Sequence, residues 1–142
     1  GNDFVVINNM DLNLRLSKQK IKELCTPHFG IGADGLILVE ASECCDIRMN
    51  YFNKDGSVAE MCGNGVRCLA KYAADHELID VSVPFSVETR AGKIVAEIVD
   101  TSKECSVIRV SMGKVSFDTK DLPVLTDKAE LIGEKIHYNH EE

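Results

Sequence analysis

The sequence has 142 residues, the length of one domain or of one lobe of a larger protein. Its 44% apolar and 27% charged residues exclude a disordered chain. Its net charge of −7 and its short apolar runs exclude general binding to nucleic acid and insertion into a membrane. We therefore expect a cytoplasmic protein with neither kind of partner.

Apolar periodicity predicts several strands and two helices. Ser17 is a suitable N-cap for the first helix, which continues to Cys25. Val66, Leu69 and Ala73 follow the helical period in the second helix, over 65–76. The predicted strands are 3–9, 35–41, 47–51, 85–89, 93–99 and 105–112, with turns at 53–56 and 90–93. This element order favours an α+β fold with a lobe over 1–117, followed by a connector and the start of a second lobe over 118–142.

The six cysteines show no Cys-x-x-Cys spacing, and none of the four histidines stands at zinc-finger spacing from a cysteine pair. Nothing in the sequence indicates secretion, so a disulfide framework is not expected either. We predict no metal and no organic cofactor.

The segment 60–68, Glu-Met-Cys-Gly-Asn-Gly-Val-Arg-Cys, carries the chemistry. Its glycines precede a periodic helix, whose free N–H groups and dipole favour an anion. Cys62 at that helix terminus would be stabilised as a thiolate, and the same turn would hold a carboxylate. The structural alternative is that Cys62 only fills the core, as cysteines often do. Cys68 is expected to pack.

Four motifs occur in order: Gly-Asn-Asp-Phe at 1–4, Gly-Ile-Gly-Ala-Asp-Gly at 30–35, Tyr-Phe-Asn-Lys-Asp-Gly-Ser at 51–57 and Met-Cys-Gly-Asn-Gly-Val-Arg-Cys at 61–68. Over residues 1 to about 115 the chain resembles the N-terminal half of diaminopimelate epimerases, which are racemases that use no pyridoxal phosphate. The resemblance implies a mixed, largely antiparallel sheet curled around the second helix, in one of two pseudo-equivalent lobes. Arg67, Lys71 and Asp75 should then lie at the wetter edge of this central helix.

The resemblance also implies an isomerase that interconverts L,L- and meso-diaminopimelate through two cysteines on opposite faces of the α-carbon. Cys62 would be one acid/base. Asn2 and Asn53 would hydrogen-bond the substrate, and Gly63 and Asn64 would bind its carboxylate. The second cysteine would lie in a C-terminal lobe after residue 142, so we expect the isolated chain to be inactive. Assembly as a homodimer is left open.

Several residues depart from the family pattern or are interpreted structurally. Many relatives carry a substrate-contacting Gln at the position of Gly35, and the family's segment before Asn2 is longer. Asp34 is expected to satisfy local backbone donors, and Arg67 to form a structural ion pair. Proline racemase-like relatives carry His at the position of Asn64.

The remaining alternatives are a proline-type racemase, a non-catalytic interaction domain and a redox module that pairs Cys62 with Cys68. The last would require unwinding of the helix, because six helical residues span about 9 Å and a disulfide needs Cα atoms within about 7 Å.

Overall fold

The computed structural model describes residues 1–101 and 105–135. The chain divides into two compact units, Gly1–Met112 and a second unit that begins at Gly113. Within the second unit, the described residues 113–135 contain one antiparallel bridge, between Asp118 and Glu130. Residues 136–142, the end of the segment expected to begin a second lobe, lie outside the described residues.

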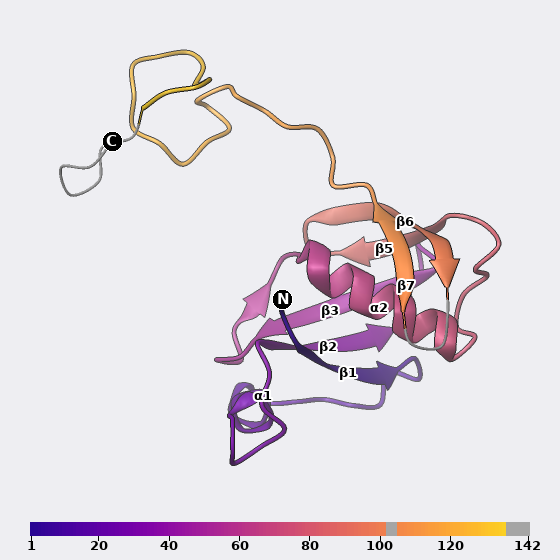
Figure 1. The fold of residues 1–142 in the computed structure, drawn as a ribbon. Helices are drawn as coiled ribbons and strands as arrows, with labels where there is room; N and C mark the ends of the chain where they lie inside the picture. Colours follow the sequence, from indigo (N-terminus) through magenta and orange to yellow (C-terminus); the bar gives the residue numbers. More distant parts are fainter. Residues whose placement is uncertain (102–104, 136–142) are drawn as a thin grey trace. The chain divides into compact units, whose positions relative to one another are not determined.

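The first unit is built on a seven-stranded mixed sheet (Figure 1). Six strands follow the order β1-β2-β3-β5-β6-β7, and β4 pairs with the free part of β3. The β1–β2 and β3–β5 pairs are parallel, whereas the other four pairs are antiparallel. The strands are β1 Phe4–Asn9, β2 Gly35–Glu40, β3 Ile47–Asn53, β4 Val58–Ala59, β5 Phe85–Thr89, β6 Gly92–Thr101 and β7 Ser106–Val110. The predicted mixed, largely antiparallel sheet is confirmed.

Two helices connect the parallel pairs, because a parallel connection needs a crossover. Helix α1, Lys18–Cys25, joins β1 to β2, and α2, Gly63–Asp75, lies between β3 and β5 in the chain. Alternate residues of β2 face opposite sides of the sheet: Leu36 and Leu38 cluster with α1, and Ile37 and Val39 cluster with α2. The helices therefore cover opposite faces, which explains why all six residues of β2 are buried.

Helix α2 is the central helix that the sequence predicts. Val66, Leu69 and Ala73 are 0% exposed, and the helix packs on β1, β2, β6 and β7. Arg67 and Asp75 are exposed, whereas Lys71 is partly buried and forms a 2.5 Å ion pair with Asp75. Helix α1 begins as predicted, because the Ser17 hydroxyl accepts a hydrogen bond from the Lys20 N–H at 3.2 Å.

Several boundaries differ from the sequence-based prediction by one or two residues; β3, for example, ends at Asn53 instead of residue 51, and β6 covers Gly92–Thr101 instead of 93–99. Helix α2 begins at Gly63, so the glycines interpreted as a turn before the helix form its first turn. Strand β7 ends at Val110 instead of residue 112. The two-residue strand β4 was not predicted, since two residues are too few to show an alternating pattern.

Candidate active site

Cys62 is the N-cap residue of α2, with an extended backbone (φ −145°, ψ 118°). Its carbonyl accepts the first helical hydrogen bond, from the Val66 N–H at 2.9 Å, while its partly buried thiol makes no capping hydrogen bond. The N–H groups of residues 63–65 precede this bond and have no acceptor among the described residues. One helix terminus therefore presents an uncommitted thiol and three backbone donors.

Close packing explains the glycine at position 65. A Cβ atom there would lie 2.8 Å from the Met49 Cε and 3.2 Å from the Ile37 Cδ1. A side chain at position 65 would therefore require the ends of the Met49 and Ile37 side chains to move. Sheet contacts thereby fix the position of the Cys62 turn.

Asn64, the second residue of α2, belongs to a chain of side-chain hydrogen bonds. Its Nδ2 donates to the Asn2 Oδ1 at 2.7 Å, and the Asn2 Nδ2 donates to the Asp34 Oδ2 at 2.9 Å. The Arg67 guanidinium donates to the Asn64 Oδ1. Arginine can only donate and an ionised carboxylate can only accept, so the two ends of the chain set the orientation of both amides.

Two expectations were wrong here. Arg67 forms no ion pair with a described residue and instead binds Asn64, three positions earlier on the same helix. The Asp34 carboxylate accepts from the Asn2 side chain instead of a local backbone donor, because the parallel β1–β2 pair brings residues 2 and 34 together. Both contacts place a charged group against a predicted substrate-binding amide.

Asn53 is held at the carboxyl end of β3. Its Nδ2 donates to the Ser57 hydroxyl at 3.0 Å, and its Oδ1 accepts from the Tyr51 hydroxyl at 3.3 Å. The predicted turn at 53–56 is confirmed by the 2.9 Å bond from the Gly56 N–H to the Asn53 carbonyl. Unlike Asn2 and Asn64, Asn53 contacts its own turn.

Tyr51 is a residue of this site to which the sequence analysis gave no role, although it lies in a predicted strand and begins the 51–57 motif. Its ring is 9% exposed and packs edge-on against Phe4, with the centroids 5.8 Å apart. Burial raises the pKa of the Tyr51 hydroxyl, and the nearby Cys62 and Asp34 raise it further. The phenol therefore stays protonated and keeps its donor directed at Asn53. Its position among four glycine-rich or asparagine-containing motifs is the signal that would have identified it.

A groove of about 570 Å³ runs beside this hydrogen-bonded chain. Asn2, Asn64 and Arg67 are among its polar lining residues, while Val6, Tyr72 and Ile108 supply apolar surface. Cys68 also lines the groove, and burial raises the pKa of its thiol. Cys62 is not among the lining residues. The structure thus brings Asn2 and Asn64 together, and it places Cys62 next to Asn64 along the turn.

The described ranges contain no disulfide and no group of three His, Cys, Asp or Glu side chains able to hold a metal ion. Neither helix of these ranges is long and apolar enough to cross a bilayer. The arrangement at Cys62 suits proton transfer by a thiol next to a bound anion.

Comparison with known proteins agrees with this geometry. The sequence pattern of the diaminopimelate epimerase family matches residues 1–118. The diaminopimelate epimerase of Alkaliphilus metalliredigens is 42% identical over 137 residues, which cover 96% of this chain and 48% of that protein. Diaminopimelate epimerase 2 of Nostoc sp. is 45% identical, with 96% and 47% covered. The chain spans about half the length of these relatives.

Solved structures show the same fold. A PhzF-family phenazine biosynthesis protein of Bacillus anthracis superposes with a TM-score of 0.59 at 22% identity, over 78% of this chain and 34% of that chain. A methylitaconate-delta-isomerase superposes with a TM-score of 0.55 at 14% identity, over 72% and 33%. These likenesses concern the fold alone. Because the family pattern covers most of its length and the curated relatives share more than 40% of its residues, the chain belongs to the diaminopimelate epimerase family.

Proposed function

We propose that this chain is the N-terminal lobe of a diaminopimelate epimerase of lysine and peptidoglycan precursor biosynthesis. The enzyme would interconvert L,L- and meso-diaminopimelate in the cytoplasm without a cofactor. The observation that supports this most is the N-cap position of Cys62, beside three N–H groups with no acceptor among the described residues. Membership of the family supports diaminopimelate as the substrate.

In this mechanism Cys62 is one of two acid/base groups. Its thiolate removes the α-proton from one face of the substrate, or its thiol returns a proton to that face. The N–H groups of Gly63 and Asn64 would bind the carboxylate on the reacting carbon and stabilise the negative charge that develops there. Asn2 and Asn53 would hydrogen-bond the substrate and fix the α-carbon in front of the thiol.

The second acid/base must approach the opposite face of the same carbon. We propose that it is a cysteine in the half of the protein that corresponds to the remaining length of the relatives, with residues 118–142 forming the connector and the start of that lobe. It follows that the isolated 142-residue chain should not epimerise diaminopimelate, since one thiol cannot serve both faces.

The test uses the protein with both lobes and follows substrate configuration and α-proton exchange in D₂O by NMR. Cys62→Ala should abolish epimerisation. Cys68→Ala is the matched control, which should retain turnover and lose about 1 kcal/mol of stability. Sustained turnover by Cys62→Ala, or by the isolated chain, would overturn the two-cysteine assignment. Racemisation of proline in place of diaminopimelate would assign the protein to the other branch.

A further inference from the structure

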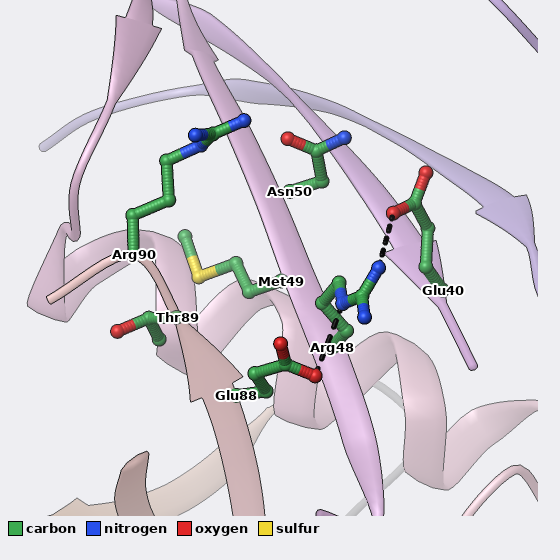
Figure 2. A pocket seen from close by; sticks show the side chains of 7 residues that line it. All are labelled: Glu40, Arg48, Met49, Asn50, Glu88, Thr89 and Arg90. Carbon is green, nitrogen blue, oxygen red and sulfur yellow. Dashed lines mark hydrogen bonds and ion pairs between the residues drawn. The ribbon is translucent and has the colours of Figure 1, made fainter. Parts of the chain in front are cut away.

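A second pocket, of about 340 Å³, lies between β3 and β5 (Figure 2). These strands are paired only at Ile47–Val87 and Arg48–Glu88. Beyond this point their ladder ends, and side chains from 49–50 and 89–90 line the pocket. Three of its lining residues, Glu40, Met49 and Thr89, are at least nine-tenths buried, so the pocket is built into the sheet.

The pocket is lined by none of the residues assigned to the Cys62 site, and it extends from Arg48 to the middle of β3. The β2–β3 register pairs Gly35 with Asn53 at the end that carries the candidate active site. It pairs Glu40 with Arg48 at the other end. A ligand in this pocket would therefore contact other residues than those assigned to the proposed reaction, although Met49 also packs beneath the first turn of α2.

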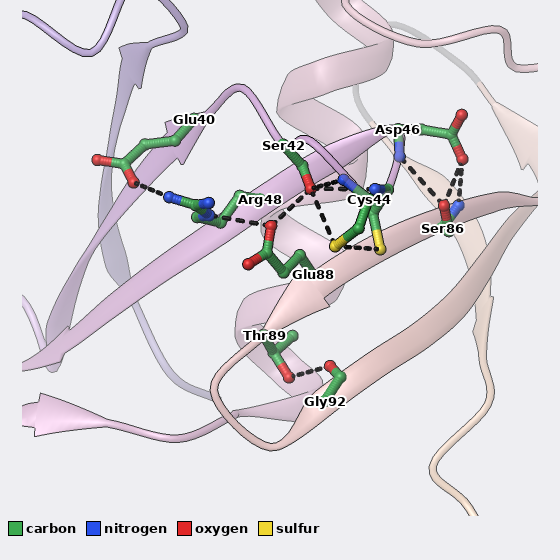
Figure 3. Close-up of polar contacts among 10 residues, drawn as sticks. Glu40, Ser42, Cys44, Asp46, Arg48, Ser86, Glu88, Thr89 and Gly92 are labelled. Carbon is green, nitrogen blue, oxygen red and sulfur yellow. Dashed lines mark hydrogen bonds and ion pairs between the residues drawn. The ribbon is translucent and has the colours of Figure 1, made fainter.

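One side of the pocket has an excess of negative charge. The Arg48 Nε donates to the Glu88 Oε2 at 3.0 Å, while its Nη1 lies 4.0 Å from the Glu40 Oε2 (Figure 3). The Ser42 hydroxyl also donates to the Glu88 Oε2, at 2.5 Å, so neither of these two donors occupies Oε1. The Cys44 thiol is a further neighbour of the Glu88 carboxylate, and the Asn9 amide donates to the Glu40 Oε1 at 2.8 Å. Two carboxylates face one guanidinium, which leaves a formal charge of −1.

The other side carries a positive charge. Figure 2 shows the Arg90 guanidinium and the Asn50 amide at the end of the pocket away from Glu88. Neither side chain has a hydrogen-bond or ion-pair partner in the described part of the chain. The pocket therefore offers uncommitted donors at one end and uncommitted acceptor capacity at the other.

We propose that this pocket binds the zwitterion of a free amino acid. The carboxylate would accept from Arg90 and Asn50, and planar guanidinium groups are well suited to carboxylates. The ammonium group would donate to the Glu88 Oε1 and compensate the excess charge beside Arg48. A purely anionic ligand would face the two carboxylates, and a purely cationic one would face Arg90. The inference stands on this pocket alone and does not depend on the proposed epimerase activity.

The test is an amide NMR titration of the isotope-labelled 142-residue chain at constant ionic strength. Glycine, β-alanine and 5-aminopentanoate provide increasing charge separation, while acetate and methylammonium provide one charge each. We expect saturable shifts at the amides of residues 48–50 and 88–92 with at least one amino acid, and weaker binding of both single-charge compounds. Shifts confined to residues 2 and 62–66 would overturn the proposal, as would equally tight binding of acetate or methylammonium, or no saturable shift.

Two variants test whether Arg90 and Asn50 bind the carboxylate of the ligand. Arg90→Met keeps the length of the side chain but removes its charge, and Asn50→Asp keeps the shape but adds a repelling charge. Each should weaken binding at least about tenfold, because each removes or opposes a charge-assisted contact. Arg15→Met is the matched control, since Arg15 is also exposed and has no partner in the described ranges. It should bind like the parent chain. Unchanged affinity in both Arg90→Met and Asn50→Asp would refute the site, and the amide spectrum reports whether each variant is folded.

Discussion

The side-chain amide of Asn64 donates to the Asn2 Oδ1 at 2.7 Å, across 62 positions of sequence. This contact ties the first turn of α2 to the segment that precedes β1. It orders two groups that the family resemblance assigns to substrate binding. The Arg67 guanidinium donates at one end of this chain of hydrogen bonds, and the Asp34 carboxylate accepts at the other. Together they determine which way the Asn64 and Asn2 amides face.

The first prediction is that removal of the Arg67 guanidinium lets the side-chain amides of Asn64 and Asn2 change their orientation. In Arg67→Met, we expect the side-chain NH₂ signals of Asn64 and Asn2 to shift and broaden in amide NMR spectra. In the two-lobed protein kcat/KM should fall about tenfold, which corresponds to the loss of about 1.4 kcal/mol of interaction. Lys71→Met is the matched control, because it breaks the Lys71–Asp75 pair on the same helix and leaves Asn64 untouched. Equal effects of the two variants would contradict the ordering role.

The second prediction concerns Gly35, the first residue of β2. A Cβ atom there would lie 2.6 Å from the Phe52 carbonyl oxygen and 2.8 Å from the Tyr51 Cε2. The carbonyl belongs to β3 and cannot move away without disturbing the β2–β3 pairing. Gly35→Ala should therefore destabilise the chain by about 1–3 kcal/mol in urea unfolding. Gly1→Ala, with no atom within 4 Å of its added Cβ, should be neutral, and a neutral Gly35→Ala would contradict the packing argument.

The third prediction concerns acid stability. The Ser42 hydroxyl and the Arg48 guanidinium lower the pKa of Glu88 in the folded chain. A lowered folded pKa means that folding favours the ionised form. The stabilisation is complete at neutral pH and is lost as pH falls from the ordinary Glu value through the folded pKa. Glu88→Gln should thus lower Tm at pH 7, and the difference should vanish in strong acid. Glu43→Gln serves as the control at an exposed carboxylate. A Tm difference that is constant with pH would exclude the charge effect.

The cysteines should differ in reactivity. Cys25 is 2% exposed, and burial, together with the Asp3 charge, raises the pKa of its thiol. Pulsed alkylation at neutral pH with peptide mass spectrometry should therefore label Cys25 at least about tenfold more slowly than Cys62, because labelling of Cys25 requires local opening. Exposed Cys44 provides the reference for an accessible thiol. Faster labelling of Cys25 than of Cys62 would contradict the packing of α1 on β2.

Local patterns were sufficient to predict most elements and the helix terminus at Cys62. The N-cap at Ser17 and the alternating burial of Ile47, Met49 and Tyr51 depend on residues that are neighbours in the sequence. A short window of sequence is therefore enough to predict the helix start and the strand. No short window of sequence shows that β1 pairs in parallel with β2, or that β3 pairs in parallel with β5, because each pair joins segments that are distant in the sequence. For this reason the roles of Asp34 and Arg67 were misassigned: the first depends on strand register and the second on the rotamer of a helical neighbour.

The pocket between β3 and β5 could not be predicted from short windows of sequence either. Arg48 and Glu88 are 40 positions apart in the sequence. These two residues meet Asn50 and Arg90 only because the β3–β5 ladder stops after the Arg48–Glu88 pair. Nothing in either segment alone distinguishes these charges from an ordinary solvated surface.

The two faces of β2 are covered by helices of unequal extent. Helix α1 has eight residues and packs on β2 through Ile21 and Cys25, whereas α2 has thirteen and contacts strands across the sheet. Opening α1 would expose only one side of a strand whose other side stays buried beneath α2. Native-state fluctuations should therefore be graded, and amides of 18–25 should exchange with deuterated solvent through subglobal openings while those of 66–73 wait for global unfolding. The helix that Cys62 caps should thus be the last element to lose its structure.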